Sequence, residues 1–385
     1  MVVLGTRPEA IKLAPVVLSL DASAQFDPFV VLTAQHREMV DQVLSLFAIE
    51  PRYDLNIIQP RQTLTEVTTR ALSGLSALVA DEAPDAVVVQ GDTTTTFAGA
   101  LAAFYAGVPV VHVEAGLRTG NRRSPFPEEI NRRLTTQLGD LHLAPTPANR
   151  ANLLAEGTAP GGVVVTGNTV IDALRWAADQ PRTFDDPTLA ALDDDPRPML
   201  LVTAHRRESW GAGMASIGRA LGELARSEPD LLVVFPIHRN PVVRQAIVPH
   251  VKGCPNVVVV EPLPYGEFAV LMRRAHVILT DSGGIQEEGP SLGKPVLVLR
   301  DTTERPEALQ SGTVRLVGTD QAAIVEGVRT LLHDPAAYAA MAQAVNPYGD
   351  GRAAERSTAA MANFFGLGPP PDEFSPSGWE TLDDG

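Results

Sequence analysis

Residues 86–116 read AVVVQGDTTTTFAGALAAFYAGVPVVHVEAG and decide the fold. The stretch opens with an apolar, β-branched run, Ala86–Val89, and closes with a second one, Val110–Val113. Enough residues lie between them for a helix, and such a strand–helix–strand unit belongs to a parallel sheet that is buried on both faces. Asp92 and Glu114 each follow the end of one of these runs. The stretch therefore predicts polar groups at the carboxyl ends of two parallel strands.

Runs of the same kind recur in two sets on either side of this stretch. The first set is Val2–Leu4, Phe29–Leu32, Ala86–Val89, Val110–Val113, Leu141–Leu143 and Val163–Val165. The second is Met199–Val202, Leu232–Phe235, Val257–Val260, Val277–Leu279, Val296–Leu299 and Val314–Val317. Between most consecutive runs there are enough residues to form a helix. We therefore predict an α/β protein of two Rossmann-like, doubly wound domains.

The predicted boundaries follow breaks in this rhythm. We assign residues 1–175 to the N-terminal domain, 176–198, which contain a run of Asp and Pro, to a linker, and 199–352 to the C-terminal domain. Ala353–Phe365 has the composition of a helix, expected to pack back on the first domain. Residues 366–385 are rich in Pro, Gly and acidic residues, which predicts a disordered tail.

Composition narrows the class of protein. A length of 385 residues exceeds the usual size of one core. Lys and Arg number 31 and Asp and Glu 46, so the net charge of −15 argues against nucleic acid or an anionic membrane as a partner. The single cysteine, Cys254, suits a reducing compartment. No apolar run of about 18 residues occurs, so we expect neither a membrane span nor a signal peptide. We expect a cytoplasmic protein.

The first half carries a candidate anion site and candidate acids. Gly5-Thr6-Arg7-Pro8-Glu9 follows a strand and opens a helix, where backbone amides, Arg7 and Lys12 favour an anion; a plain strand–helix turn explains it equally well. Asp92 fits both a ligand-binding acid and a helix N-cap. With Glu114 and Glu128 it is expected to converge at one sheet edge, where gathered carboxylates favour proton transfer. We interpret Arg132 and Arg133 as neutralising neighbouring Glu residues on a solvated helix face.

The second half carries a candidate phosphate site. His205-Arg206 and His238-Arg239 each follow a strand, and imidazole beside guanidinium suits a phosphate. In Thr280–Gly289 a strand ends and Ser282-Gly283-Gly284 exposes amides at a helix start, with Glu288 further along. This layout is the strongest local signal in the sequence and can seat a diphosphate and a ribose; a glycine-rich helix cap is the less favoured alternative. Neither a dinucleotide nor a P-loop fingerprint occurs, and no spacing suggests a metal.

Seven segments together resemble a known family. They are GTRPEAIKLAPV, TAQHREM, QGDTTTTFAGALAAFYAGVPVVHVEAGLRTG, PFPEEINRR, VTGNTVIDAL, TAHRRESWG and DSGGIQEEGPSLGKPVLVLRDTTERPEAL, in order from residue 4 to about 318. In these the chain resembles the bacterial non-hydrolysing UDP-N-acetylglucosamine 2-epimerases. The resemblance implies a glycosyltransferase-B-like fold with two domains facing across a cleft, a homodimer, and reversible formation of UDP-N-acetylmannosamine without NAD or metal. The implied route is anti elimination of UDP to 2-acetamidoglucal and syn re-addition.

The resemblance also implies roles for individual residues. Proton transfer falls to Asp92, Glu114, Glu128 and His205, with the C2 base unassigned. UDP binding falls to Arg7, Lys12, His205, Phe268, Ser282, Gly283, Gly284, Glu288 and Arg305. A second, activating UDP-N-acetylglucosamine would meet Gln35, His36, Arg61, Gln62, Arg206 and His238, near which Glu38 and Ser209 depart from the family pattern.

Other functions fit the same residues. A sibling enzyme acting on another UDP-2-acetamido sugar and a hydrolysing epimerase share most of these motifs. A glycosyltransferase of the same fold, or a sugar-nucleotide sensor without activity, belongs to a different class. The full set of carboxylates argues against the sensor.

Overall fold

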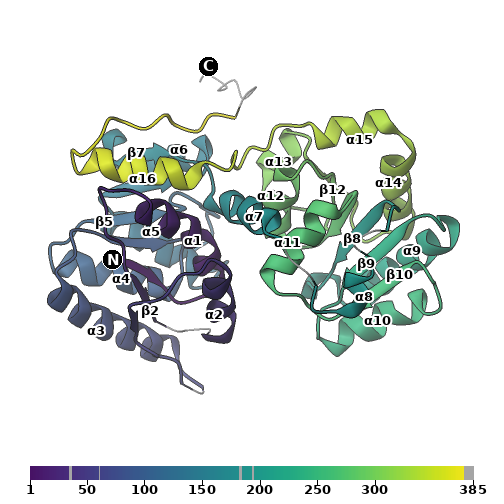
Figure 1. The fold of residues 1–385 in the computed structure, drawn as a ribbon, viewed down its shortest axis with the longest axis horizontal. Helices are drawn as coiled ribbons and strands as arrows, with labels where there is room; N and C mark the ends of the chain where they lie inside the picture. The colour runs from purple at the N-terminus through teal and green to yellow at the C-terminus, as the bar shows by residue number, and fades with distance from the viewer. Residues whose placement is uncertain (34–36, 60, 182–183, 193–194, 377–385) are drawn as a thin grey trace. The chain divides into compact units, whose positions relative to one another are not determined.

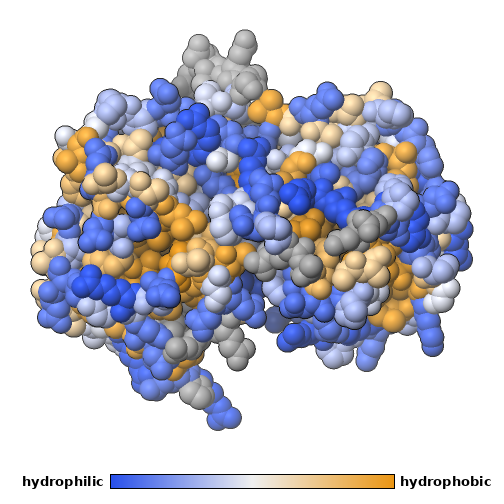
Figure 2. Space-filling view, in the orientation of Figure 1, coloured by the Kyte–Doolittle hydropathy of each residue, from blue (hydrophilic) through white to orange (hydrophobic). Residues whose placement is uncertain are grey.

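The computed structural model describes residues 1–376 except 34–36, 60, 182–183 and 193–194. Its contacts separate into two units, Met1–Ala173 with Tyr348–Gly385, and Leu174–Pro347. All twelve predicted strands are present, and each unit is a parallel sheet with helices on both faces (Figure 1). The prediction of two doubly wound α/β domains is confirmed. Hydrophilic residues cover much of the visible surface, with apolar residues between them (Figure 2).

The sheet of the first unit has the strand order β3-β2-β1-β4-β5-β6-β7. Its strands are β1 (Val2–Leu4), β2 (Val30–Leu32), β3 (Tyr53–Asp54), β4 (Val87–Gln90), β5 (Val110–Val113), β6 (Leu141–Ala144) and β7 (Val163–Val165). The helices are α1 (Arg7–Asp21), α2 (Arg37–Leu46), α3 (Leu64–Glu82), α4 (Thr94–Tyr105), α5 (Glu128–Leu138), α6 (Pro147–Ala155), α7 (Thr169–Asp179) and α16 (Ala353–Phe364). The order reverses between β1 and β4, and ligands of open α/β sheets bind beyond the strand ends at such a point.

The second sheet has the order β10-β9-β8-β11-β12-β13. Its strands are β8 (Met199–Thr203), β9 (Leu232–Pro236), β10 (Val257–Val260), β11 (Val277–Thr280), β12 (Val296–Val298) and β13 (Val314–Leu316). The helices are α8 (Pro187–Ala190), α9 (Ala212–Ser227), α10 (Pro241–Val251), α11 (Tyr265–Arg274), α12 (Gly283–Ser291), α13 (Pro306–Gln310), α14 (Gln321–His333) and α15 (Pro335–Ala342). Here the order reverses between β8 and β11, which pair from Leu200↔Val277 to Thr203↔Thr280.

The chain passes between the units within α7 and again before Tyr348. The sequence predicted a linker at 176–198, but these residues group with the second unit and α7 runs through the start of that range. Helix α16, yellow in Figure 1, belongs to the first unit, where Thr358 Oγ1 donates to Ser19 Oγ at 2.8 Å.

The predicted disordered tail needs correction. Within 366–376, Phe374 is buried, its backbone N–H donates to Val165 O at 2.8 Å, and the Arg356 guanidinium lies 5.6 Å from its ring centroid. Glu373 also pairs with Arg150 at 2.6 Å. The amino-acid composition of this segment predicted disorder, and that prediction was wrong for 366–376. One aromatic side chain and one main-chain hydrogen bond anchor the segment, although most of its other residues are polar. Residues 377–385 lie outside the described part of the chain.

Asp172 on α7 holds the start of α16 by accepting a hydrogen bond from Ala354 N at 2.8 Å, and burial raises its pKa to about 6. Between its ordinary value and 6 the folded chain binds more protons than the unfolded chain, so lowering the pH through this window stabilises the fold. We expect Asp172→Asn to raise the free energy of unfolding above pH 7 by up to about 3 kcal/mol. Thermal unfolding at pH 7.5 and 5 checks this.

Asp350→Asn is the matched control. Hydrogen bonds from Arg356 hold the pKa of Asp350 below its usual value, so its charged form stabilises the fold and its loss should destabilise the protein at neutral pH. An Asp172→Asn variant that is less stable than the wild type at pH 7.5 would contradict the account of Asp172.

Candidate active site

In the first unit, Glu9 joins the loops after β1 and β4, which meet where the strand order reverses. Its Oε2 accepts from Gly5 N at 3.0 Å and Thr6 N at 2.7 Å, while Oε1 accepts from Thr93 Oγ1 at 2.6 Å. Burial raises the pKa of Glu9, and these hydrogen bonds oppose that shift. Glu9 thus holds the turn bearing Arg7 against the loop bearing Asp92, a role that was not predicted from its sequence context.

Gly5 has a steric reason for its place in this turn. A Cβ atom there would lie 2.1 Å from Thr33 Oγ1 and 2.5 Å from Thr95 Oγ1, which themselves form a hydrogen bond of 2.8 Å. Only glycine lets the end of β1 pass this close to its neighbours.

Glu114 lies just past β5, in a left-handed backbone conformation with φ of 59°. Lys12 Nζ lies 2.5 and 2.6 Å from its two carboxylate oxygens, Asn168 Nδ2 donates to Oε1 at 3.2 Å, and Gln90 Nε2 donates to Oε2. Such a backbone is uncommon outside glycine and occurs mainly where the surroundings enforce it. The carboxylate is therefore aimed and held by donors from three separate segments.

Asp92 follows β4 and pairs with Arg132 of α5. Burial raises the pKa of Asp92, the Arg132 charge opposes this, and the Glu114 charge adds to it. The interpretation of Arg132 as a solvated surface charge was wrong, because its side chain is 6 % exposed and faces Asp92. Arg133 is more exposed and pairs with Glu129 at 3.0 Å, which agrees with its predicted role.

Glu128 and Arg7 occupy less enclosed positions. Glu128 is the first residue of α5 and is half-buried, whereas the next residue, Glu129, is fully buried and accepts from Thr119 N at 3.1 Å. Arg7 is exposed at the first position of α1. Lys12 was predicted to bind phosphate, and here it pairs with Glu114.

In the second unit, His205 follows β8 and Asp281 follows β11, on either side of the reversal point. Asp281 is fully buried, and its Oδ2 accepts from the backbone N–H groups of His205 and Arg206 at 2.7 and 2.8 Å. His205 Nδ1 lies 3.0 Å from Oδ1. Burial alone raises the pKa of Asp281, but the hydrogen bonds from His205 and Arg206 hold it below its ordinary value. Asp281 is a site residue that was not predicted from the sequence.

The start of α12 is arranged for an anion. Ser282 occupies the N-cap position without a side-chain cap bond, so this end of the helix presents backbone amides. Arg305 lies against it, so close that a Cβ on Gly283 would be 2.6 Å from Arg305 NH1. Glu287 Oε1 accepts from Arg305 Nε at 2.5 Å and fixes the guanidinium. Predicted residues Ser282, Gly283 and Arg305 thus meet at one helix terminus.

Glu288 and Phe268 lie on the two helices that follow β10 and β11. Glu288 is buried in α12, and Tyr265 Oη donates to its Oε1 at 3.4 Å. Phe268 is half-buried in α11, and Gly284 is exposed in the first turn of α12.

The residues predicted for an activator are partly described. Gln35 and His36 lie outside the described residues. Arg61 is exposed with φ of 60°, and Gln62 Nε2 donates to Ile57 O at 2.6 Å. In the second unit the His238 ring stacks on that of His205 with centroids 5.8 Å apart, and Arg206 pairs with Glu304 at 3.4 Å.

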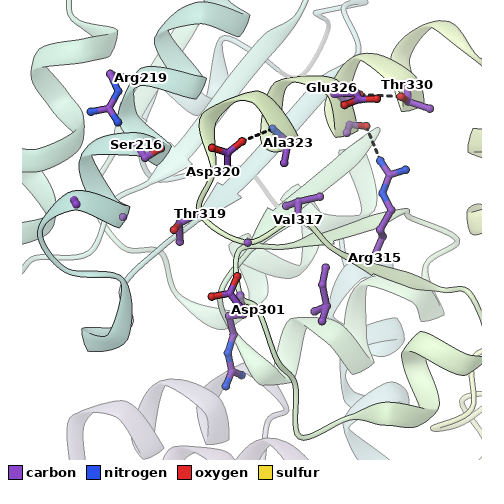
Figure 3. A pocket seen from close by; sticks show the side chains of 16 residues that line it. Ser216, Arg219, Asp301, Arg315, Val317, Thr319, Asp320, Ala323, Glu326 and Thr330 are labelled. Carbon is purple, nitrogen blue, oxygen red and sulfur yellow. Dashed lines mark hydrogen bonds between the residues drawn. The ribbon is translucent and has the colours of Figure 1, made fainter.

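A cavity of about 850 Å³ in the second unit contains none of the predicted site residues. Two of its polar side chains are engaged in local structure (Figure 3): Asp320 caps α14 at Ala323 N (3.0 Å), and Arg315 donates to Gly327 O (3.1 Å). In the described part of the chain, no group of three or more His, Cys, Asp or Glu side chains is placed to hold a metal ion. Nor does any described helix have the length and apolar character needed to cross a membrane.

Comparison with known proteins decides the family. Residues 18–362 match the family model described as UDP-N-acetylglucosamine 2-epimerase. The chain belongs to the UDP-N-acetylglucosamine 2-epimerase family. It is 55 % identical over 372 residues to the UDP-N-acetylglucosamine 2-epimerase of Escherichia coli K12, covering 94 % of this chain and 98 % of that protein. The resemblance seen in the seven motifs is confirmed.

Solved structures of the family share the fold. One crystal structure of a UDP-N-acetylglucosamine 2-epimerase superposes with a TM-score of 0.91 at 49 % identity, covering 97 % of this chain and 98 % of that one. The Neisseria meningitidis enzyme, solved with UDP-GlcNAc bound, gives a TM-score of 0.79 at 51 % identity, covering 92 % and 96 %. The epimerase-family fold is thus shared over nearly the whole chain.

Proposed function

We propose that the protein interconverts UDP-N-acetylglucosamine and UDP-N-acetylmannosamine by inverting C2 without hydrolysis. The proposal rests on one observation. The functional groups at the point where the strand order reverses differ between the two units. The first has Asp92 and Glu114 held by cationic and amide donors. The second has the His205–Asp281 pair and the open start of α12 beside Arg305. The carboxylates of the first unit suit proton transfer at the sugar, and the imidazole, helix amides and guanidinium of the second unit suit a diphosphate.

The proposed route balances without an oxidant. C2–H has no adjacent ketone and is a very weak acid, so its loss is coupled to breaking of the C1–O bond. A carboxylate takes the C2 proton, the C–H electron pair forms the C1=C2 bond of 2-acetamidoglucal, and UDP leaves with the C1–O pair. UDP oxygen then re-adds to C1, and a proton returns to the opposite face of C2. No hydride moves, so the route has no step for NAD, and none for a metal.

The residues divide between two tasks in this route. Asp92, Glu114, Glu128 and His205 transfer protons and stabilise the intermediate. The amides of Ser282, Gly283 and Gly284, with Arg305, Arg7 and Lys12, stabilise the departing diphosphate, as donors aimed at developing charge do. Glu288 accepts from the ribose and Phe268 lies by the uracil.

We expect Gly283→Ala to weaken UDP binding about 10-fold, because the new Cβ displaces the Arg305 guanidinium and removes a charge-assisted hydrogen bond. Gly284→Ala should weaken it less, since its Cβ would have only an ordinary contact of 3.5 Å with Glu288 Oε2. Calorimetric titration with UDP measures both variants. Equal UDP affinities in the wild type and in Gly283→Ala would contradict the proposal that the diphosphate binds at the start of α12 beside Arg305.

Incubation with UDP-N-acetylglucosamine in deuterium oxide, followed by proton NMR, tests the function. We expect both UDP-sugars at equilibrium with deuterium at C2. Free UDP and free N-acetylmannosamine would indicate a hydrolysing enzyme, and lack of turnover would point to another UDP-2-acetamido sugar. Transfer of the sugar with C2–H intact would indicate a glycosyltransferase.

We further propose a homodimer that works in the cytoplasm. Phe104 and Tyr105 at the end of α4 and Leu134 on α5 are 56, 71 and 43 % exposed, which suits a surface covered by a second copy. Light scattering after gel filtration measures the oligomeric state.

The free thiol of Cys254 suits a reducing compartment, which supports the proposed cytoplasmic location. We also propose an activating UDP-N-acetylglucosamine at the six predicted residues, and the stacked His238 and nearby Arg206 support the second unit's share of that site.

A further inference from the structure

Asn168, which none of the predicted roles includes, lies buried between β7 and α7. Its Oδ1 accepts from Val170 N at 3.1 Å, so it occupies the N-cap position of α7, which begins at Thr169. Its Nδ2 donates to Glu114 Oε1 at 3.2 Å. Because the amide oxygen is committed to the helix, the nitrogen is directed at the carboxylate.

The backbone of Asn168 adds a third connection. Its N–H donates to Tyr348 O at 2.7 Å, and Tyr348 is the first residue of the segment by which the chain returns to the first unit. The next residue, Gly349, lies so close that a Cβ there would be 3.5 Å from Asn168 N and O and 3.3 Å from Ile171 Cγ1. Helix α7 is the element by which the chain leaves the unit. Asn168 therefore contacts both segments that link the units.

Glu114 depends on its donors for orientation. Its φ of 59° is a conformation that a glutamate adopts only when its surroundings hold it. Lys12 and Gln90 come from α1 and β4, beside the centre of the sheet. Asn168 differs from these two because it is also hydrogen-bonded to the returning segment. A shift of either linking segment would move this donor relative to Oε1.

We propose that Asn168 is a positioning residue for Glu114 and couples the orientation of this carboxylate to the two segments that link the units. This inference rests on the proposed C2 epimerisation, in which Glu114 transfers a proton. Asn168 acts on the chemical step through Glu114, so its loss should lower kcat and leave the affinity for UDP unchanged.

Asn168→Asp and Asn168→Ser keep an oxygen that can cap α7 and remove the amide nitrogen that donates to Glu114. Asp and Ser cap helices about as well as Asn, so α7 should keep its cap while Glu114 loses its donor. We expect the thermal unfolding of Asn168→Ser, and the UDP dissociation constants of both variants, to stay near wild type, whereas the added charge of Asn168→Asp beside Glu114 should lower its thermal stability at neutral pH. The rate of C2 exchange should fall by roughly 10- to 100-fold, as when a group that orients an acting side chain is removed.

The pH profile distinguishes positioning from a general loss of structure. Asn168→Asp places a second carboxylate beside Glu114 and disfavours its ionised form, so the acidic limb of the C2-exchange profile should move to higher pH. Asn168→Ser adds no charge and should lower the rate without this shift. A weakened structure would change both variants alike.

Coupling through Asn168 is tested at Gly349. In Gly349→Ala the added Cβ would lie 3.3 Å from the Ile171 side-chain atom Cγ1 and in ordinary contact, at 3.5 Å, with the Asn168 backbone, and the φ of 159° is one that alanine rarely adopts. The returning segment must therefore shift beside Asn168 without the new methyl reaching Glu114, and we expect a several-fold lower rate of C2 exchange. In the Asn168→Ser background the same change should cost little more, because the donor is already gone. Independent, multiplicative losses in the double variant would contradict the coupling.

Asn152→Ala is the matched control. It removes another side-chain amide contact of the same unit, half-buried, from Nδ2 to Gly116 O at 2.9 Å, close to Glu114 along the chain. It should exchange C2 at the wild-type rate. Wild-type rates in both Asn168 variants, equal losses of UDP affinity and rate, or failure of both to fold would overturn the inference. A wild type that binds UDP but never exchanges C2 would instead refute the proposed function.

Discussion

Glu114→Gln is expected to lower the rate of C2 exchange by roughly 100- to 10,000-fold while UDP still binds. Glutamine keeps the size of the side chain and can accept from Asn168, but it holds no charge and can neither take nor return a proton. It also leaves Lys12 without the carboxylate that lies 2.5 Å from its Nζ. Deuterium incorporation at C2, read by proton NMR, gives the rate, and calorimetry gives the UDP dissociation constant.

Asp92→Asn is a second test of the same proposal, and Glu156→Gln is its control. Asp92 shares the first unit's reversal point, pairs with Arg132, and should show a comparable loss of exchange with UDP binding kept. Glu156 forms an ion pair of 2.8 Å with Arg118 in the same unit and has no assigned part in the reaction, so its glutamine variant should behave as wild type. Unimpaired epimerisation in both the Asp92 and Glu114 variants would refute their roles.

The second large effect is expected from Asp281→Asn. The carboxylate contacts His205 Nδ1 at 3.0 Å and accepts two backbone N–H groups, so it fixes both the ring and its loop. An asparagine can still accept from the loop, but it brings no charge to an imidazolium. We expect turnover to fall by roughly 100-fold or more, in the range set by general acid–base catalysis. His205→Ala should lose UDP affinity as well as turnover.

The pH dependence of Asp281→Asn has a defined sign. The folded pKa of Asp281 is lowered, so the stability contributed by its charge is present above the unfolded value and is lost as the pH falls through the folded value. The variant should therefore lose stability at neutral pH and little in acid. Asp320→Asn, which keeps the α14 cap at Ala323 N, is the control in the same unit. An Asp281→Asn enzyme with wild-type turnover would contradict the role of Asp281 in holding and charging the His205 ring.

Residues next to strand ends could be predicted from the sequence because strand periodicity places them. Apolar runs located β4, β5 and β11, and a residue just past such a run must lie at the sheet edge, so Asp92, Glu114 and Ser282 were found. The strand order gives the reason they matter, since β1–β4 and β8–β11 are the reversal points. Strand order is set by long-range packing, which local patterns do not encode.

The partners of these residues were missed for a similar reason. Arg132 was interpreted as a surface charge, yet Glu129, Arg132 and Thr136 repeat at helical spacing and form a buried polar face of α5. That spacing was the available signal. Asn168 comes from the far end of the sheet, β7, so no local pattern links it to Glu114. Asp281 stood within a recognised motif, but its contact with His205 depends on the β8–β11 pairing.

Positional isotope exchange tests most directly the claim that loss of the C2 proton is coupled to departure of UDP. UDP-N-acetylglucosamine carrying ¹⁸O in the oxygen between C1 and phosphorus is incubated with the enzyme, and the label is located by ³¹P NMR. We expect the label to move into non-bridging positions of the β-phosphate as C2 exchanges with solvent, because the C1–O bond opens and the β-phosphate rotates before UDP re-adds. Complete retention of the label in the bridge, with C2 still exchanging, would contradict it.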